Sequence, residues 1–136
     1  MKIMLDENAI LPRRAHDTDA GYDLYARDSV VIEPRSSATF DTGVHVDLPV
    51  GTVGMLKSKS GLNVNHGLVG EGVIDCGYTG SIRVKLYNHS DERYIVKAGD
   101  KITQLVIMPI ITPDLEIVEE FAETERGNGG FGSTGR

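Results

Sequence analysis

The chain has 136 residues, 40% of them hydrophobic and 25% charged, which is the size and composition of one globular domain. Fourteen Lys and Arg against 20 Asp and Glu give a net charge of −6, which argues against a nucleic-acid-coating surface, because such a surface needs a basic face. The lone Cys76 excludes an intrachain disulfide, and together with the absence of a membrane-length apolar run it predicts a cytoplasmic protein.

Short runs of Val, Ile, Leu, Tyr and Thr, separated by Gly, Pro, Asp and Asn, predict many short strands. Alternation of apolar and basic residues over 82–86 is typical of a half-buried strand. One short helix is predicted after Ser60, which we interpret as its N-cap. The sequence therefore predicts an all-β, jelly-roll-like fold of roughly ten or more short strands with at most one short helix. In chain order, the predicted strands are residues 2–5, 22–26, 30–32, 38–41, 45–48, 52–57, 68–69, 82–88, 94–96, 102–109 and 115–118.

The last eleven residues, 126–136, differ from the rest because five of them are Gly. Such a segment forms no core of its own, since Gly loses the most backbone entropy on ordering. Phe131, with an Arg at each end and a Ser-Thr pair behind it, is unusual for a solvated tail. Two interpretations stay open, a disordered tail and a lid that closes over a ligand. We predict a β domain over 1–125 and a Gly-rich lid over 126–136.

Three other places carry candidate chemistry. Asp23 begins a predicted strand beside a glycine, and residues 57–62 alternate cations and hydroxyls, which suits phosphate binding. Asp75 follows an apolar pair and precedes Tyr78 in a glycine-flanked turn, where a carboxylate can serve as general base. Each taken singly is more often an ordinary surface residue. Cations, hydroxyls, an isolated acid and an aromatic tail together favour a nucleotide ligand.

At this point the sequence resembles the homotrimeric dUTPases, the deoxyuridine triphosphate nucleotidohydrolases, from about Ala15 to Arg136. All five motifs of that family occur in order, and five motifs in register are a highly specific signal. They are Ala20-Gly21-Tyr22-Asp23-Leu24, Lys59-Ser60-Gly61-Leu62, Gly72-Val73-Ile74-Asp75-Cys76-Gly77-Tyr78-Thr79-Gly80, Gly99-Asp100-Lys101-Ile102-Thr103-Gln104-Leu105 and Arg126-Gly127-Asn128-Gly129-Gly130-Phe131-Gly132-Ser133-Thr134-Gly135.

The resemblance implies hydrolysis of dUTP to dUMP and diphosphate with Mg²⁺, by a jelly-roll homotrimer whose active sites lie between subunits. It implies that Asp75 activates the attacking water, that Tyr78 packs under the deoxyribose and excludes a 2′-hydroxyl, and that Asp23 holds Mg²⁺ through water. Further substrate-binding positions implied by the resemblance are Lys59, Ser60, Gly61 and Gln104 near the phosphates, Val73 and Ile74 in the uracil hairpin, Arg83, and Arg126, Phe131, Gly132, Ser133 and Thr134 in the lid.

The chain departs from the family pattern at a few positions. Lys59 replaces the usual Arg, Glu71 lies in the short uracil hairpin where a neutral residue is more usual, and Cys76 follows the catalytic acid as a bystander. A dCTP deaminase on the same fold is the nearest competing function, but Lys85 stands where its Glu is needed. A regulatory module that senses dUTP and binds a partner protein is a second competing function, and a purely structural trimer is a third.

Overall fold

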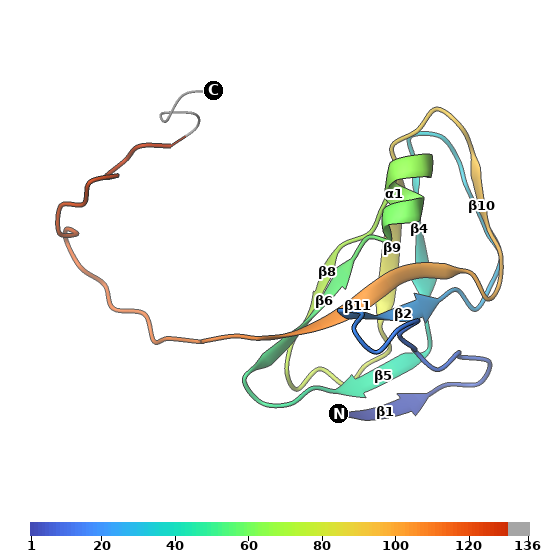
Figure 1. Cartoon of the computed structure of the whole chain (residues 1–136), viewed down its shortest axis with the longest axis horizontal. Helices are drawn as coiled ribbons and strands as arrows, with labels where there is room; N and C mark the ends of the chain where they lie inside the picture. The colour runs from blue at the N-terminus through green and yellow to red at the C-terminus, as the bar shows by residue number, and fades with distance from the viewer. Residues whose placement is uncertain (131–136) are drawn as a thin grey trace.

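The computed structural model describes residues 1–130, which form eleven strands and one short helix (Figure 1). The fold is therefore the predicted jelly-roll-like, mostly-β architecture. The elements are β1 (Lys2–Leu5), β2 (Gly21–Tyr25), β3 (Val30–Ile32), β4 (Ser37–Asp41), β5 (Val44–Asp47), β6 (Thr52–Lys57), α1 (Ser60–His66), β7 (Leu68–Val69), β8 (Gly72–Ile74), β9 (Arg83–Asn88), β10 (Tyr94–Val96) and β11 (Lys101–Pro109).

The strands form four antiparallel sheets around one core. A four-stranded sheet has the order β2-β11-β6-β8, a three-stranded sheet has the order β4-β9-β7, and the pairs β1-β5 and β10-β3 complete the body. Both larger sheets bury apolar side chains in the same cluster, with Leu24, Leu56 and Leu105 from the first and Phe40 and Leu86 from the second. The four-stranded sheet positions the candidate site. Its strands are far apart in the sequence, and the register in which they pair decides which side chains lie next to one another.

Most strand predictions are confirmed, and the alternation in β9 gives the expected pattern of alternately exposed and buried residues. The strand β8 was not predicted. Its segment is short and rich in Gly, which is typical of a turn, and it becomes a strand because it pairs with β6 from Gly54 to Leu56.

The helix is confirmed, but the prediction that Ser60 is its N-cap is wrong. Lys59 is the N-cap, with an extended backbone at φ −80 and ψ 130, and Ser60 is the first helical residue. The first turn closes when the Asn63 N–H donates to the Lys59 carbonyl at 2.9 Å. At the other end, Gly67 at φ 65 caps the helix and turns the chain into β7.

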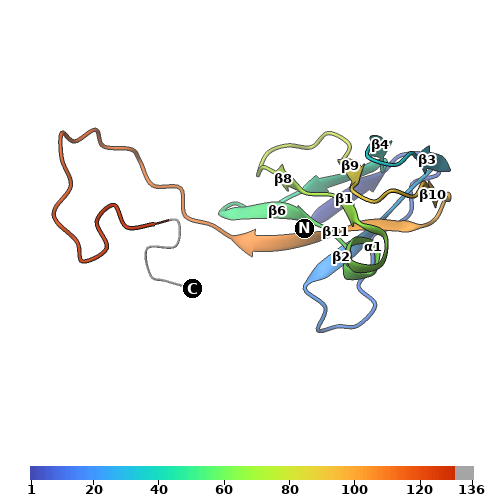
Figure 2. The ribbon, with the colours of Figure 1, turned by 90° about the horizontal axis from the view of Figure 1, so that it is seen from above.

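Residues 110–130 leave the body after β11 as an extended arm without strand or helix (Figures 1 and 2). The predicted strand over 115–118 is therefore wrong. A strand needs a neighbour for its N–H and C=O groups, and none lies beside this segment in the part of the chain that the structure describes. Within residues 1–130, no helix is long and apolar enough to cross a membrane.

Candidate functional site

The first group of predicted site residues is assembled by the register of the four-stranded sheet. Asp23 on β2 pairs with Gln104 on β11, and Gln104 pairs with Lys57 at the end of β6. The Gln104 amide donates to the Ser58 carbonyl at 3.4 Å. Gly21 makes room for this side chain, because an added Cβ would lie 2.7 Å from Gln104 Oε1. The sheet thus carries Asp23 and Gln104 to the segment that leads into α1.

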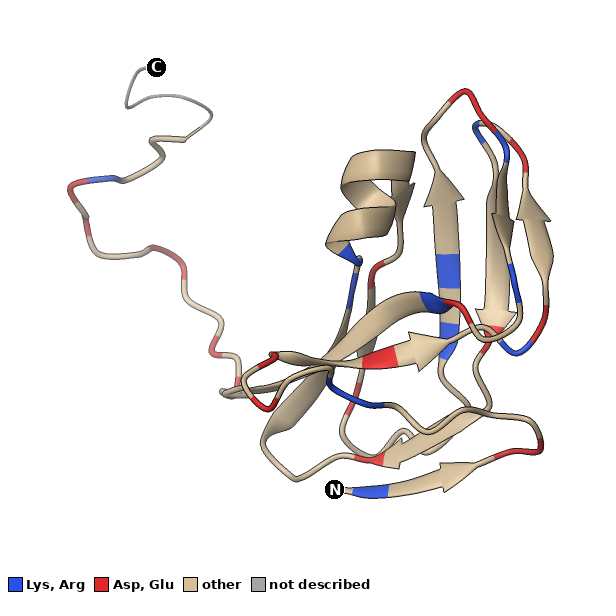
Figure 3. Ribbon diagram, turned by 45° about the vertical axis from the view of Figure 1, so that its right-hand side comes forward, with Lys and Arg blue, Asp and Glu red and all other residues tan. Residues whose placement is uncertain are grey.

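Asp23 is almost fully buried, with 6% of its surface exposed, and both of its carboxylate oxygens bind lysines. Lys59 contacts Oδ1, and the Lys101 ammonium lies 2.7 Å from Oδ2. In Figure 3, basic positions lie just ahead of α1 and at the start of β11, and an acidic position lies on β2, the strand that pairs with β11. Burial disfavours the charged carboxylate, but the hydrogen bonds and charges of Lys101 and Lys59 outweigh it and hold the pKa of Asp23 below its usual value.

The residues after β6 form the phosphate-binding candidate. Lys59 ends the extended segment, and Ser60 and Gly61 open α1, both exposed. Apart from its chain neighbours and the backbone of α1, no heavy atom among residues 1–130 lies within 4 Å of the position that a Gly61 Cβ would take, so a ligand can approach this backbone closely. With Lys101 alongside, this edge offers two ammonium groups, a hydroxyl and exposed backbone, a donor set suited to an anion.

Glu71 anchors the segment that carries the phosphate-binding candidate. Its carboxylate accepts from Lys57 Nζ at 2.5 Å, from the Ser58 N–H at 3.1 Å and from the Ser58 hydroxyl at 3.0 Å. The hydrogen bond from Lys57 is the main cause that lowers the pKa of Glu71, burial opposes it, and the Ser58 contacts reinforce it. The β7–β8 loop therefore fixes the segment that places Lys59.

The second group lies in the turn after β8. Asp75 is exposed, and its carbonyl accepts from the Tyr78 N–H at 3.1 Å. Gly77 at φ 92 permits the tight turn. The Tyr78 ring is 48% exposed, and its hydroxyl donates to the Ser81 carbonyl at 3.1 Å. On β8 itself, Val73 is exposed and Ile74 is buried, as alternation along a strand requires.

Among residues 1–130, the remaining predicted residues form no hydrogen bond or ion pair with either group. Arg83 is exposed on β9, and its Nε lies 3.9 Å from Asp41 Oδ2. Arg126 lies in the extended arm, where its Nε donates to the Gly129 carbonyl at 3.0 Å. The predicted lid residues Phe131, Gly132, Ser133 and Thr134 lie outside the described residues.

One chain does not bring the two main groups together. Asp75 follows Ile74, which pairs with Gly54, whereas Gln104 pairs with Lys57 at the other end of β6. Three residues of strand span about 10 Å, and β8 and β11 flank opposite sides of β6. The Asp75 turn and the Asp23–Lys59 group therefore occupy different parts of the surface, and neither is a complete site.

Lys101 belongs to the site but was missed as a site residue in the sequence. In the sequence it stands only as the third residue of the fourth motif, and nothing local links it to Asp23, which lies 78 positions earlier. The link arises when β11 pairs with β2, where a register shift falls between Lys101 and Thr103. The one signal for this ion pair in the sequence is a basic residue without an assigned role at the start of a predicted strand that carries a motif.

Protein groups alone do not form a metal cage in this site. Among residues 1–130, no three His, Cys, Asp or Glu side chains gather closely enough to hold an ion. Asp23 is a single carboxylate, and it already binds two lysines. This donor set fits Mg²⁺ only in its common binding mode, in which waters and substrate phosphates supply most ligands and a carboxylate holds one of the waters.

We expect acid to remove the stability that Asp23 contributes. Its folded pKa lies below the unfolded value of about 3.9, so the contribution is complete above that pH and is lost as the pH falls through the folded pKa. Asp23→Asn should be less stable at pH 7 by about 1–3 kcal/mol, below the cost for a fully buried pair because both lysines reach solvent.

Urea unfolding between neutral and acid pH measures this difference. The wild type and Asp23→Asn should converge as the pH falls. Asp91 forms only an exposed pair with Arg35, so the control Asp91→Asn should change the stability only slightly. A constant gap between wild type and Asp23→Asn would contradict the prediction.

A family model described as dUTPase matches residues 7–135. The deoxyuridine 5′-triphosphate nucleotidohydrolase of Eremothecium gossypii is 45% identical over 138 residues, which cover 99% of this chain and 90% of that protein. The Clostridium tetani protein of the same name is 41% identical over 136 residues, covering 98% and 94%.

Solved structures show the same similarity. The dUTPase of Staphylococcus bacteriophage 80alpha with dUpNHpp matches with a TM-score of 0.93 and 38% identity, covering 99% of this chain and 98% of that one. A mutant dUTPase from phage phi11 of S. aureus, described for its coordination of a structural Mg(II) ion, matches with a TM-score of 0.82 and 38% identity, covering 88% and 97%.

Proposed function

Because this chain belongs to the dUTPase family and is a dUTP nucleotidohydrolase, we propose that Asp75 activates the water that attacks the α-phosphorus, releasing dUMP and diphosphate. The observation that carries this proposal is the exposed Asp75 in a tight turn beside Tyr78, open to a ligand and to water. A carboxylate there takes the proton of the attacking water, and the phosphate-binding residues stabilise the charge that develops on the phosphoryl oxygens.

Lys59, Ser60, Gly61 and Gln104 bind the phosphate chain in this proposal. Their support is the cationic edge where β6 enters α1, with Lys101 as a further cation beside Asp23. When the triphosphate binds, its oxygens offer Lys59 and Lys101 an alternative to the Asp23 carboxylate. From the lid, Arg126, Ser133 and Thr134 bind the terminal phosphate, Phe131 stacks on uracil, and Gly132 approaches the ligand.

Mg²⁺ belongs to the same proposal, with Asp23 holding one of its waters. When bound, the ion neutralises phosphate charge and orients the chain for in-line attack. Asp23 suits this role because it stays ionised although it is buried: the two lysines outweigh the burial and lower its pKa. Without ligand, the lysines that flank it set the orientation of the carboxylate.

Tyr78 selects the sugar, and the hairpin over 67–74 binds uracil through its backbone, with Val73, Ile74 and Arg83 nearby. The half-exposed Tyr78 ring, fixed by its hydroxyl contact with Ser81, supports a flat surface under the deoxyribose.

A homotrimer with shared sites explains why one chain holds only parts of a site. The Asp75 turn and the Asp23–Lys59 group are separated on one protomer, so a second protomer supplies the missing group. The arm supports this assembly, because it carries exposed apolar side chains beyond the body, as an interface segment does. They are Ile111, Leu115, Ile117 and Phe121. The lone Cys76 supports a reducing, cytoplasmic location.

Diphosphate release with Mg²⁺ from dUTP, UTP, dCTP and dTTP tests the proposed function. We expect fast release from dUTP alone, which would establish base and sugar selectivity in one experiment. Tight dUTP binding without release would instead favour the regulatory module.

We expect Tyr78→Ala to weaken discrimination against UTP. Removing the ring leaves space for a 2′-hydroxyl, so the ratio of kcat/KM for dUTP over UTP should fall by about 10-fold or more. Tyr78→Phe is the matched control, since it keeps the ring and loses only the contact with the Ser81 carbonyl. If Tyr78→Ala rejects UTP as strongly as the wild type, sugar selection lies elsewhere.

A further inference from the structure

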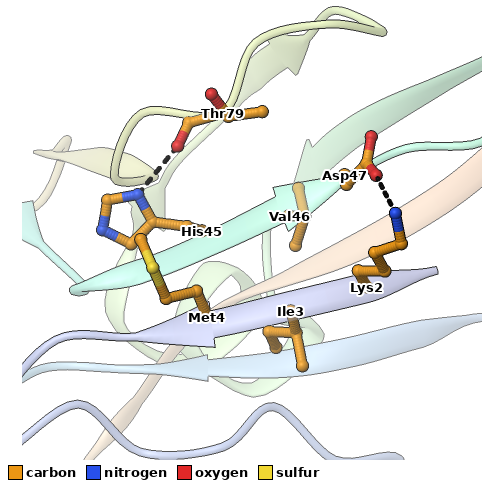
Figure 4. Close-up of a pocket in the computed structure, with 7 residues that line it drawn as sticks. All are labelled: Lys2, Ile3, Met4, His45, Val46, Asp47 and Thr79. Carbon is orange, nitrogen blue, oxygen red and sulfur yellow. Dashed lines mark hydrogen bonds and ion pairs between the residues drawn. The ribbon is translucent and has the colours of Figure 1, made fainter.

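His45, which none of the roles above uses, lines a pocket of about 240 Å³ formed by the paired strands β1 and β5 together with Thr79 (Figure 4). Its side chain is only 17% exposed. Nδ1 lies 2.8 Å from the Thr79 carbonyl, and Nε2 lies 3.1 Å from Asp6 Oδ1. Figure 4 shows the ring reaching from β5 to Thr79 in the loop above it. His45 thus connects the β1–β5 layer to the loop that carries Asp75.

Both partners of the ring only accept hydrogen bonds. A carbonyl and an ionised carboxylate carry no proton to donate, so each ring nitrogen needs its own hydrogen. Only the imidazolium satisfies both contacts at once. The hydrogen bond to the Thr79 carbonyl is the main cause that raises the pKa of His45, burial opposes it, and Asp6 and the charge of Asp41 add to it.

The other charged groups around the ring are few. Arg27 lies 3.8 Å from Oδ2 of Asp6, the carboxylate that the ring binds, and 3.5 Å from Oδ1 of Asp41, whose charge also raises the pKa of His45. On the rim of the pocket, Lys2 and Asp47 pair with each other at 3.5 Å. None of these side chains donates to the Thr79 carbonyl, so none replaces His45 there.

Thr79 lies near the end of the turn over 75–80, which carries the proposed catalytic side chains. Tyr78 precedes it directly, and Asp75 lies four residues earlier. Two contacts hold Tyr78 within the turn itself, to Asp75 and to Ser81. Besides His45, the body holds the turn over 75–80 through the Cys76 thiol, which donates to the Leu48 carbonyl at 3.5 Å and is a weak donor.

We propose that His45 is a positioning residue, whose imidazolium holds the turn of Asp75 and Tyr78 in place by binding the Thr79 carbonyl and the Asp6 carboxylate together. This inference rests on the proposed roles of Asp75 and Tyr78. When the pH rises through the pKa of His45, one ring nitrogen loses its proton. The lone pair of that nitrogen then faces an acceptor oxygen, and the hydrogen bond is lost. The turn then loosens and turnover falls, with a midpoint above the ordinary histidine pKa of about 6.5.

The test compares kcat, KM and their pH profiles for the full chain and its variants. His45→Leu removes both contacts, so kcat should fall by about 10-fold or more, because misplaced groups slow the chemical step. His45→Asn places an amide N–H near Nδ1, so it should recover part of kcat but show no alkaline limb. Asp47→Asn, on the rim of the same pocket, should match the wild type.

NMR of the labelled His45 ring supplies a readout independent of turnover. The ring should titrate above the ordinary value in the wild type and at lower pH in Asp6→Asn. Two results would overturn the proposal. One is that both His45 variants keep the wild-type kcat and the wild-type fall of kcat at alkaline pH. The other is a His45 ring that titrates at or below about 6.5 in the wild type. If Asp75→Asn retains normal turnover in the same assay, the proposed role of Asp75 fails, whereas the ring titration still tests the His45 contact.

Discussion

Replacing Asp75 by Asn should lower the turnover of dUTP by about 10²–10⁴-fold, the range that a positioned general base contributes. The amide keeps the size of the side chain but does not accept a proton from the attacking water. Fold and nucleotide binding should persist, because the Asp75 side chain is exposed and the turn uses its carbonyl instead. Single-turnover diphosphate release and equilibrium binding of a non-hydrolysable dUTP analogue separate the two effects.

The matched control for this change is Asp28→Asn, an exposed carboxylate between β2 and β3. Both substitutions remove one negative charge, so a general electrostatic effect would appear in both. Turnover close to wild type in Asp75→Asn would assign the base to another group. Loss of analogue binding together with turnover would make Asp75 a binding residue.

The strands that could be predicted carry a pattern within their own sequence. The strand that could not be predicted forms only because a neighbouring strand pairs with it. The alternation that predicts β9 follows directly from one buried face. The segment of β8 carries no such pattern, and it becomes a strand through three pairings with β6. The segment over 115–118 has the composition of a strand but no pairing partner among residues 1–130, so composition alone predicted too much.

The residues of the candidate site also fall into a predictable and an unpredictable group. Motif order was enough to select Asp23, Lys59, Asp75 and Gln104, because the spacing within each motif is a property of the sequence. The residues that hold them were not predictable, since Lys101, Glu71 and His45 act across strands that lie far apart in the chain. Their roles follow from antiparallel register and side-chain reach, which no single motif encodes.

Ending the chain at Glu125 should leave a folded oligomer with at least about 100-fold lower activity, as expected when groups that bind and orient the substrate are lost. The deleted segment carries the proposed lid residues, Arg126 among them, and the described part of it makes no contact with the body in one protomer (Figure 2). Diphosphate release measures the activity, and analytical ultracentrifugation measures the assembly. Full activity in the truncated protein would rule out the lid.

The part of the arm that remains after this truncation, residues 110–125, should contribute to subunit assembly. A second variant separates this role from that of the lid. Leu115 and Ile117 are 96% and 99% exposed in a single chain, so Leu115→Ser/Ile117→Ser should change protomer stability by no more than about 0.5 kcal/mol per site. If these side chains bind a neighbouring subunit, the double variant should dissociate and lose activity with the lid intact, because the Asp75 turn and the Asp23–Lys59 group then no longer meet. A stable, fully active oligomer would place the subunit contacts elsewhere. Truncation and substitution should therefore reduce activity for different reasons. The truncated protein should keep an assembly mass close to that of the wild type, whereas the double variant should have the mass of a single protomer.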